Sequence, residues 1–228
     1  MREPLLLLHG ALGAQSQFTE LAAKLQTSFA VHTMSFEGHG GEPSSNDFSI
    51  AQFAQNVIDF LTAHSMDQVN VFGYSMGGYV ALHLALHHPD KIKKIVTLGT
   101  KFQWDPESAQ KEVRMLNPAK IEEKVPHFAK ALEKIHAPGD WKEVMEKTAK
   151  MMIGMAEGAK LTDDDLKKIG HEVVIGIGSL DNMVTSTESE HAASLLPNAH
   201  LVKLEGVPHP IEKVDVEVLA AYIISNLP

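Results

Sequence analysis

Short apolar runs alternate along the chain with longer segments whose apolar residues recur at helical spacing. The runs cover Pro4–Leu8, Phe29–Ser35, Val69–Phe72, Lys94–Leu98, Glu172–Ile177 and His200–Leu204. Several of them are apolar throughout rather than alternating, which is typical of strands buried on both faces. The alternation predicts an α/β fold, in which a mostly parallel sheet of about six strands carries helices on both faces.

The predicted helices lie between these runs. They cover Gln17–Leu25, Ser49–His64, Met76–His88, Glu188–Leu195 and Ile211–Asn226. At the start of the second, Ser49 and Gln52 stand three residues apart, the spacing of a capping box in which each side chain satisfies the other's backbone donor.

The stretch from Thr100 to Gly170 breaks this rhythm. It contains charged amphipathic segments interrupted by proline, and proline blocks the continuation of a helix. This helical segment is longer than an ordinary crossover connection between two strands. We therefore expect a core domain of residues 1–100 and 170–228, with residues 101–169 inserted as a helical cap. Four methionines are expected on the inner surface of this cap, where ordinary core packing is favoured over contact with a substrate. They are Met145, Met151, Met152 and Met155.

The first candidate for chemistry is Ser75, in the pattern Gly73-Tyr74-Ser75-Met76-Gly77. The pattern G-x-S-x-G follows an apolar strand and precedes a long helix, which is the context in which it forms a nucleophile turn. Glycines on both sides would remove side chains that clash in so sharp a turn. The helix would also direct its N-terminal amides towards the reacting centre.

Further segments occur in an order and spacing that resemble the α/β-hydrolase family, in its serine esterase-like branch with a helical cap. They are Leu8-His9-Gly10-Ala11, Glu37-Gly38-His39-Gly40, Gly73–Gly77, Gly178–Val184 and Pro208-His209-Pro210. The family's usual first two strands do not precede the first segment. The resemblance therefore implies a shortened sheet, in which the strand over 29–35 is an exposed edge or is covered by a partner chain. A homodimer that forms through this edge strand is one way in which a partner chain could cover it.

The resemblance also implies a catalytic triad of Ser75, Asp181 and His209, because the acid and then the base follow the serine in the chain order of this fold. Asp105, after the preceding strand, is the alternative acid. Pro208 stands where the family usually has glycine, which stiffens the loop before the base.

The oxyanion hole is implied to consist of two backbone N–H groups, those of Met76 and Ala11, with Leu12 as the alternative to Ala11. His9 is expected to be structural, since backbone geometry is what its loop supplies. Leu12, His39 and Tyr74 are expected to contact the substrate.

The composition of the chain narrows the kinds of site, partner and cellular location that it can have. The absence of cysteine excludes disulfides and thiolate metal sites, and the net charge of −9 disfavours binding to nucleic acid. No metal, cofactor or membrane contact is expected. The N-terminal run is too short for a membrane span and lacks a signal-peptide pattern, so a cytoplasmic protein is expected.

The leading hypothesis is a carboxylesterase that cleaves a small or medium acyl ester through an acyl-enzyme. Thioesterase, lactonase and carbon–carbon bond hydrolase activity stay open, because residues of the cap would select the acyl group. A ligand-binding protein that does not use the triad is the alternative from another class.

Overall fold

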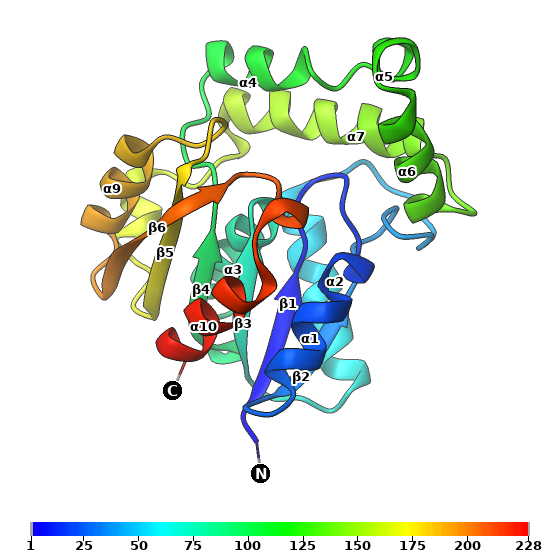
Figure 1. Cartoon of the computed structure of the whole chain (residues 1–228). Helices are drawn as coiled ribbons and strands as arrows, with labels where there is room; N and C mark the ends of the chain where they lie inside the picture. Colours follow the sequence, from blue (N-terminus) through cyan, green and yellow to red (C-terminus); the bar gives the residue numbers. More distant parts are fainter. Residues whose placement is uncertain (1, 228) are drawn as a thin grey trace.

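A computed structural model describes residues 2–227, and its centre is one six-stranded sheet in which every neighbouring pair is parallel (Figure 1). The strands are β1 (Pro4–Leu8), β2 (Ala30–Met34), β3 (Val69–Tyr74), β4 (Ile92–Leu98), β5 (Glu172–Leu180) and β6 (Ala199–Pro208). Their spatial order is β2-β1-β3-β4-β5-β6. The predicted α/β sheet is confirmed, and β2 lies at one edge as expected from the shortened sheet.

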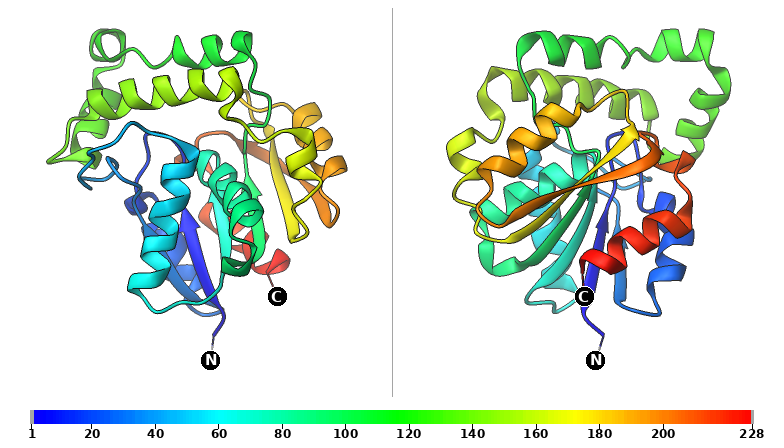
Figure 2. Two further views of the ribbon diagram at one scale, coloured as in Figure 1. Left: turned by 180° about the vertical axis from the view of Figure 1, so that it is seen from behind. Right: turned by 60° about the vertical axis from the view of Figure 1, so that its left-hand side comes forward.

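Helices pack on both faces of the sheet, as Figure 2 shows. On one face lie α1 (Thr19–Leu25) and α10 (Val216–Asn226), which contact each other. On the other lie α2 (Ile50–Ala63), α3 (Met76–His87), α8 (Asp163–Leu166) and α9 (Ser186–Leu195), whose buried residues share one apolar core. Central strand β3 is buried along its whole length because both faces are covered, which explains its apolar sequence.

Two helix predictions need correction. The segment predicted as one helix over Ile211–Asn226 is a short 3₁₀ helix over Ile211–Lys213 followed by α10. The break occurs because the Asp215 carboxylate caps α10 by accepting from Glu217 N at 2.7 Å.

The capping box predicted at the start of α2 is only half formed. Gln52 N does donate to Ser49 Oγ at 3.0 Å, but the Gln52 side chain donates to Glu37 Oε2 at 2.8 Å instead of turning back.

Between β4 and β5 the chain forms a series of helices that lie over the carboxyl ends of the strands (Figures 1 and 2). They are α4 (Pro106–Val113), α5 (Pro118–Lys124), α6 (Pro126–His136) and α7 (Trp141–Gly154), followed by a π-helical turn over Met155–Ala159 and by α8. Proline opens the first three, where its missing N–H costs no hydrogen bond. We refer to α4–α7 as the cap; the limits of 101 and 169 stay a prediction.

Within residues 2–227, no helix is both long and apolar enough to cross a membrane.

Candidate active site

Ser75 occupies the sharp turn between β3 and α3. Its backbone angles are φ 51° and ψ −115°, a combination that costs energy for any residue with a side chain. The turn is possible because its neighbours lack side chains: a Cβ on Gly77 would stand 2.2 Å from Leu8 O, and one on Gly73 would stand 2.4 Å from Gly78 N. The strained serine turn predicted from the motif is therefore present.

Backbone contacts fix the position of Ser75. Its N–H donates to Leu98 O at 2.8 Å, and its carbonyl oxygen accepts from Thr100 Oγ1 at 3.0 Å. Both partners lie at the end of the neighbouring strand β4, so the sheet itself holds the turn. Strain at Ser75 is thereby balanced by hydrogen bonds outside the turn.

His209 and Asp181 form a buried hydrogen-bonded pair. His209 Nδ1 donates to Asp181 Oδ2 at 2.7 Å, while Asp181 Oδ1 accepts from the backbone N–H groups of Met183 and Val184, each at 2.8 Å. Burial alone would raise the pKa of the Asp181 carboxyl, but its hydrogen bonds and the neighbouring imidazole outweigh burial and lower that pKa. Asp181 is therefore a carboxylate that orients the His209 ring through Nδ1, so that Nε2 does not take part in this contact.

Close backbone packing supports this pair. Gly99 lies beneath it with φ 63°, and a Cβ there would stand 3.2 Å from both Asp181 Oδ2 and His209 Nδ1. Tyr74 OH donates to the carbonyl oxygen of His209 at 2.9 Å, and burial raises the pKa of Tyr74 well above its ordinary value. The phenol thus stays neutral and holds the loop that Pro208 begins.

Asp105, the alternative acid, has a different role. It is the N-cap of α4, where its carboxylate accepts from Ser108 N at 2.8 Å and from the Gln103 side chain at 3.0 Å. It is also not among the residues that line the cavity at Ser75. This geometry favours Asp181 as the partner of the histidine.

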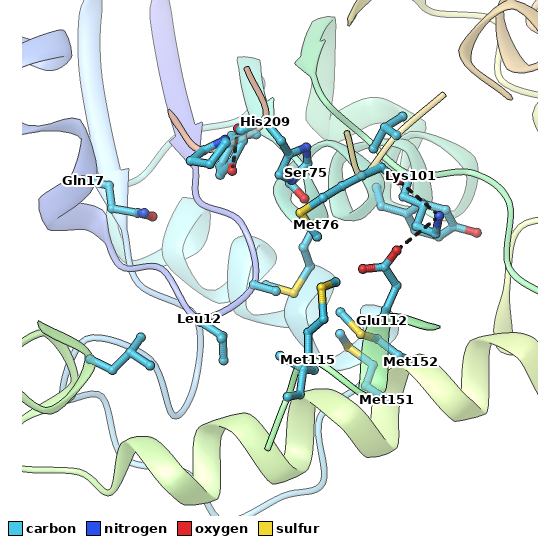
Figure 3. Close-up of a pocket in the computed structure, with 18 of the residues that line it drawn as sticks. Leu12, Gln17, Ser75, Met76, Lys101, Glu112, Met115, Met151, Met152 and His209 are labelled. Carbon is cyan, nitrogen blue, oxygen red and sulfur yellow. Dashed lines mark hydrogen bonds and ion pairs between the residues drawn. The ribbon is translucent and has the colours of Figure 1, made fainter. Parts of the chain in front are cut away.

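A cavity of about 370 Å³ lies between the sheet and the cap, and Figure 3 shows Ser75 and His209 at its wall. Ala11, Leu12, Tyr74 and Met76 line it from the core, and Met151, Met152 and Met155 line it from the cap side. Met145 does not: it is fully buried in a separate cluster inside the cap, against Ile121, Leu132 and Trp141. Met145 thus shows ordinary core packing, whereas the other three methionines line the cavity.

The two predicted oxyanion donors also border this cavity. Within residues 2–227 neither Ala11 N–H nor Met76 N–H has a hydrogen-bond acceptor, and Met76 is the first residue of α3. Two backbone amides without an acceptor, one of them at a helix start, suit a developing negative charge. Leu12 has φ 59°, which turns the loop after β1 so that its carbonyl oxygen faces the cap.

His39 is not among the residues that line the cavity. It is fully buried behind the wall, with its ring stacked on Phe48 and its centroid 5.1 Å from that of His9. The expectation that His39 contacts the substrate therefore has no support in the structure. His9 is structural as expected, because its Nε2 accepts from Phe36 N at 3.1 Å and its Nδ1 donates to Gly10 O at 2.8 Å.

Three residues at this site were not found from the sequence. His136, on α6, accepts from Gly40 N with Nδ1 and donates from Nε2 to Leu12 O, each at 3.1 Å. Lys101 and Glu112 form an ion pair in the cavity wall. Their sequence signal is that of an ordinary charged helical segment, so only the fold reveals that they face inwards.

Comparisons with known proteins identify the fold family of the chain. Residues 3–135 match a family described as "alpha/beta hydrolase fold". A pimeloyl-[acyl-carrier protein] methyl ester esterase of Chromobacterium violaceum is 38% identical over 93 residues, which are 41% of this chain and 33% of that protein. A probable alcohol acetyltransferase of Cyberlindnera fabianii is 31% identical over 103 residues, 43% of this chain and 27% of that protein. The chain thus spans between about a quarter and a third of the length of these relatives.

Two solved structures illustrate the likeness of fold. An enol-lactonase from Burkholderia xenovorans has a TM-score of 0.77 at 20% identity, covering 100% of this chain and 92% of the other. A thermophilic esterase from Thermogutta terrifontis has a TM-score of 0.77 at 20% identity, covering 98% and 88%. At this identity the likeness concerns the fold alone.

Proposed function

Because this chain belongs to the α/β-hydrolase fold family, we propose that it hydrolyses carboxylic esters through an acyl-enzyme formed on Ser75. The observation that carries the proposal is the buried hydrogen bond of 2.7 Å between His209 Nδ1 and Asp181 Oδ2, with His209 at the wall of the cavity that Ser75 also lines. The esterase named among the relatives acts on a methyl ester, which supports the same reaction class.

In the proposed reaction Ser75 Oγ attacks the ester carbonyl carbon while His209 Nε2 takes the hydroxyl proton. The Met76 and Ala11 amides receive the negative charge that develops on the carbonyl oxygen. The carbon–oxygen bond to the alcohol then breaks, and His209 returns its proton to that alcohol. A water molecule, deprotonated by His209, hydrolyses the acyl-serine and releases the acid. Asp181 stays ionised and stabilises the imidazolium in both steps.

A fluorophosphonate probe followed by peptide mass mapping tests this proposal, because such probes phosphonylate activated serines. We expect labelling at Ser75 and its loss in Ser75→Ala. Ser65→Ala is the matched control, since Ser65 also has a positive φ, 53°, but is exposed at the end of α2. Labelling at another serine, or none in the folded protein, would contradict the proposal and favour a ligand-binding role.

The same variants in a p-nitrophenyl acetate assay should differ by about 10³- to 10⁶-fold in turnover. A panel of thioesters, lactones and carbon–carbon substrates then separates the alternative activities of this fold. If a thioester or lactone is cleaved far faster than any simple ester, that compound class becomes the proposed substrate. The proposed roles of the residues then stay unchanged.

A further inference from the structure

An ion pair lies in the mostly apolar wall of the cavity at Ser75. Lys101 follows β4, Glu112 lies on cap helix α4, and Lys101 Nζ is 3.5 Å from Glu112 Oε1. The Glu112 side chain is only 3% exposed and that of Lys101 15% exposed, yet both line the cavity (Figure 3). Charges so deeply buried need close hydrogen bonds to offset the loss of their hydration.

The contacts of this pair are incomplete. The only other polar contact of Lys101 Nζ within residues 2–227 is Met183 O, also at 3.5 Å, and the face of the Trp104 ring is 5.8 Å away. Both polar contacts are longer than a good hydrogen bond of about 2.9 Å. Glu112 Oε1 has no hydrogen-bond partner within the same residues. The pair therefore offers donors and an acceptor that the protein itself does not use.

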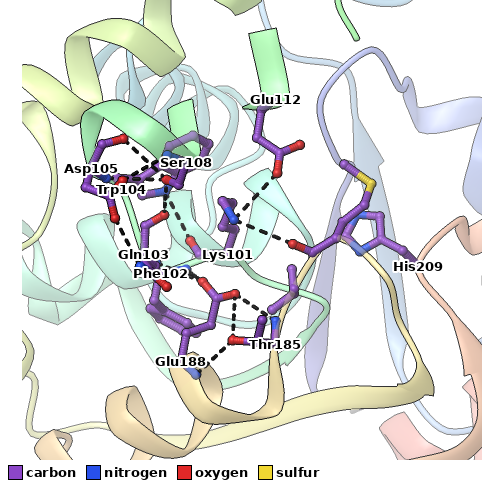
Figure 4. Close-up of polar contacts among 12 residues, drawn as sticks. Lys101, Phe102, Gln103, Trp104, Asp105, Ser108, Glu112, Thr185, Glu188 and His209 are labelled. Carbon is purple, nitrogen blue, oxygen red and sulfur yellow. Dashed lines mark hydrogen bonds and ion pairs between the residues drawn. The ribbon is translucent and has the colours of Figure 1, made fainter. Parts of the chain in front are cut away.

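The segment that carries Lys101 is held firmly. The buried carboxylate of Glu188, on α9, accepts from Phe102 N at 3.0 Å and from Gln103 N at 2.8 Å (Figure 4). The Trp104 indole donates to the carbonyl oxygen of Lys101 at 3.2 Å. Backbone fixed at Lys101 and at the two residues after it favours a preorganised binding group rather than a mobile surface lysine.

We propose that Lys101 and Glu112 form a polar subsite that selects esters carrying an uncharged hydroxyl or amide group at a distance from the reacting carbonyl; this rests on the proposed function. Such a group can donate its hydrogen to Glu112 and accept one from Lys101 at the same time, which completes the contacts of both. A substrate carboxylate would meet the Glu112 carboxylate, and a substrate ammonium would meet Lys101. Glu112 thus repels the anionic ligands that Lys101 would attract, and Lys101 repels the cationic ligands that Glu112 would attract.

Binding to the Ser75→Ala protein tests the subsite without turnover. Titration calorimetry compares methyl esters of four to eight carbons in three forms: plain, with a terminal hydroxyl and with a terminal carboxylate. Hydroxyalkyl acetates place the same hydroxyl on the alcohol side. We expect at least one hydroxylated ester to bind about 5- to 50-fold tighter than the plain ester of its length, as hydrogen bonds to charged groups provide.

The double variant Lys101→Met/Glu112→Leu should abolish that preference, and apolar replacement of a buried pair is usually tolerated. The matched control is Lys142→Met/Glu122→Leu, which removes an exposed pair between α7 and α5 with a 2.7 Å contact. If the double variant fails to unfold cooperatively, Glu112→Gln serves instead and should reduce the preference several-fold.

Three results would overturn the subsite: no preference at any chain length, a preference that survives in the double variant, or tightest binding of the carboxylated ester. These results are distinct from failure of the proposed function, which appears as absent probe labelling of Ser75. A hydroxyl preference that depends on the pair, in a protein that the probe does not label, would retain the subsite and reject the esterase.

Discussion

The carbonyl oxygen of Leu12 accepts a hydrogen bond from Nε2 of His136 at 3.1 Å, so a cap helix directly holds the loop that carries the proposed oxyanion donor Ala11. The other ring nitrogen of His136 accepts from Gly40 N at 3.1 Å. Because an N–H must donate to Nδ1, the hydrogen resides on Nε2, and the neutral ring is fixed in one tautomer. The cap, the loop that carries Ala11 and the loop around His39 thus meet at one buried imidazole.

Replacing His136 with leucine should weaken both the fold and the site. The half-buried Gly40 N–H and Leu12 carbonyl would each lose a partner, and the free energy of unfolding should fall by about 2 kcal/mol. Urea unfolding measures that loss, and the rate of fluorophosphonate labelling reports on the loop. His127→Leu, an exposed position on the same helix, is the control. Unchanged stability and labelling in His136→Leu would show that the imidazole does not hold the loop.

The buried histidines predict a loss of stability in acid. Burial, opposed in part by a hydrogen bond to Gly10, lowers the pKa of His9 to about 4, and burial beside His9 also lowers that of His39. Between about pH 6.5 and 4 the unfolded chain takes up protons that the folded chain does not, so stability falls as the pH falls. For His9 alone the full loss is about 3 kcal/mol.

Urea titrations at pH 7 and pH 5 measure this effect. His39→Phe should retain the aromatic packing against Phe48 and reduce the difference between the two pH values. An equal difference in the variant and the parent would assign the acid sensitivity to other groups.

Asp181→Asn should reduce kcat/KM for p-nitrophenyl acetate by about 10³- to 10⁴-fold with little change in structure. If the amide oxygen keeps the bonds from Met183 and Val184, the amide NH₂ faces His209 Nδ1 and forces the ring into the wrong tautomer. Asp105→Asn is the matched control, since asparagine caps a helix as well as aspartate does. A larger loss in Asp105→Asn than in Asp181→Asn would reverse the two assignments.

Gly77→Ala should disrupt the turn at Ser75, because its Cβ would stand 2.2 Å from Leu8 O and would push the start of α3 away from β1. We expect a loss of about 3 kcal/mol in unfolding free energy and no probe labelling at Ser75. Gly154→Ala, at the end of α7 where no atom lies within 4 Å of the new Cβ, should be neutral or stabilising by up to about 1 kcal/mol. Similar stabilities for the two variants would refute the steric argument.

The sequence predicted the parts of this protein that depend on local pattern. Apolar runs located all six strands, and the glycines beside Ser75 located the turn, because both follow from sterics and burial within a few residues. It missed contacts between distant segments. Gln52 turns to Glu37 rather than to its own N-cap, and His39 packs behind the cavity wall, because each orientation depends on neighbours that only the tertiary fold brings close.

The sequence likewise did not predict which residues line the cavity. No periodicity in the helical segment distinguishes Glu112, which faces the cavity, from Lys111, which is exposed beside it. The direction in which a short cap helix faces depends on how it docks, and docking is a long-range property. The residues proposed to do the chemistry were thus predicted from motifs, while the residues proposed to select the substrate were not.

The methionines around the cavity make it vulnerable to oxidants. Six of the ten methionines in the chain line it: Met76, Met115, Met151, Met152, Met155 and Met183. Strands β3–β6 contain none. A sulfoxide places a polar, chiral oxygen on a side chain that was flexible and apolar. Peroxide damage would therefore change which molecules fit beside Ser75 while the sheet that holds the serine kept its packing.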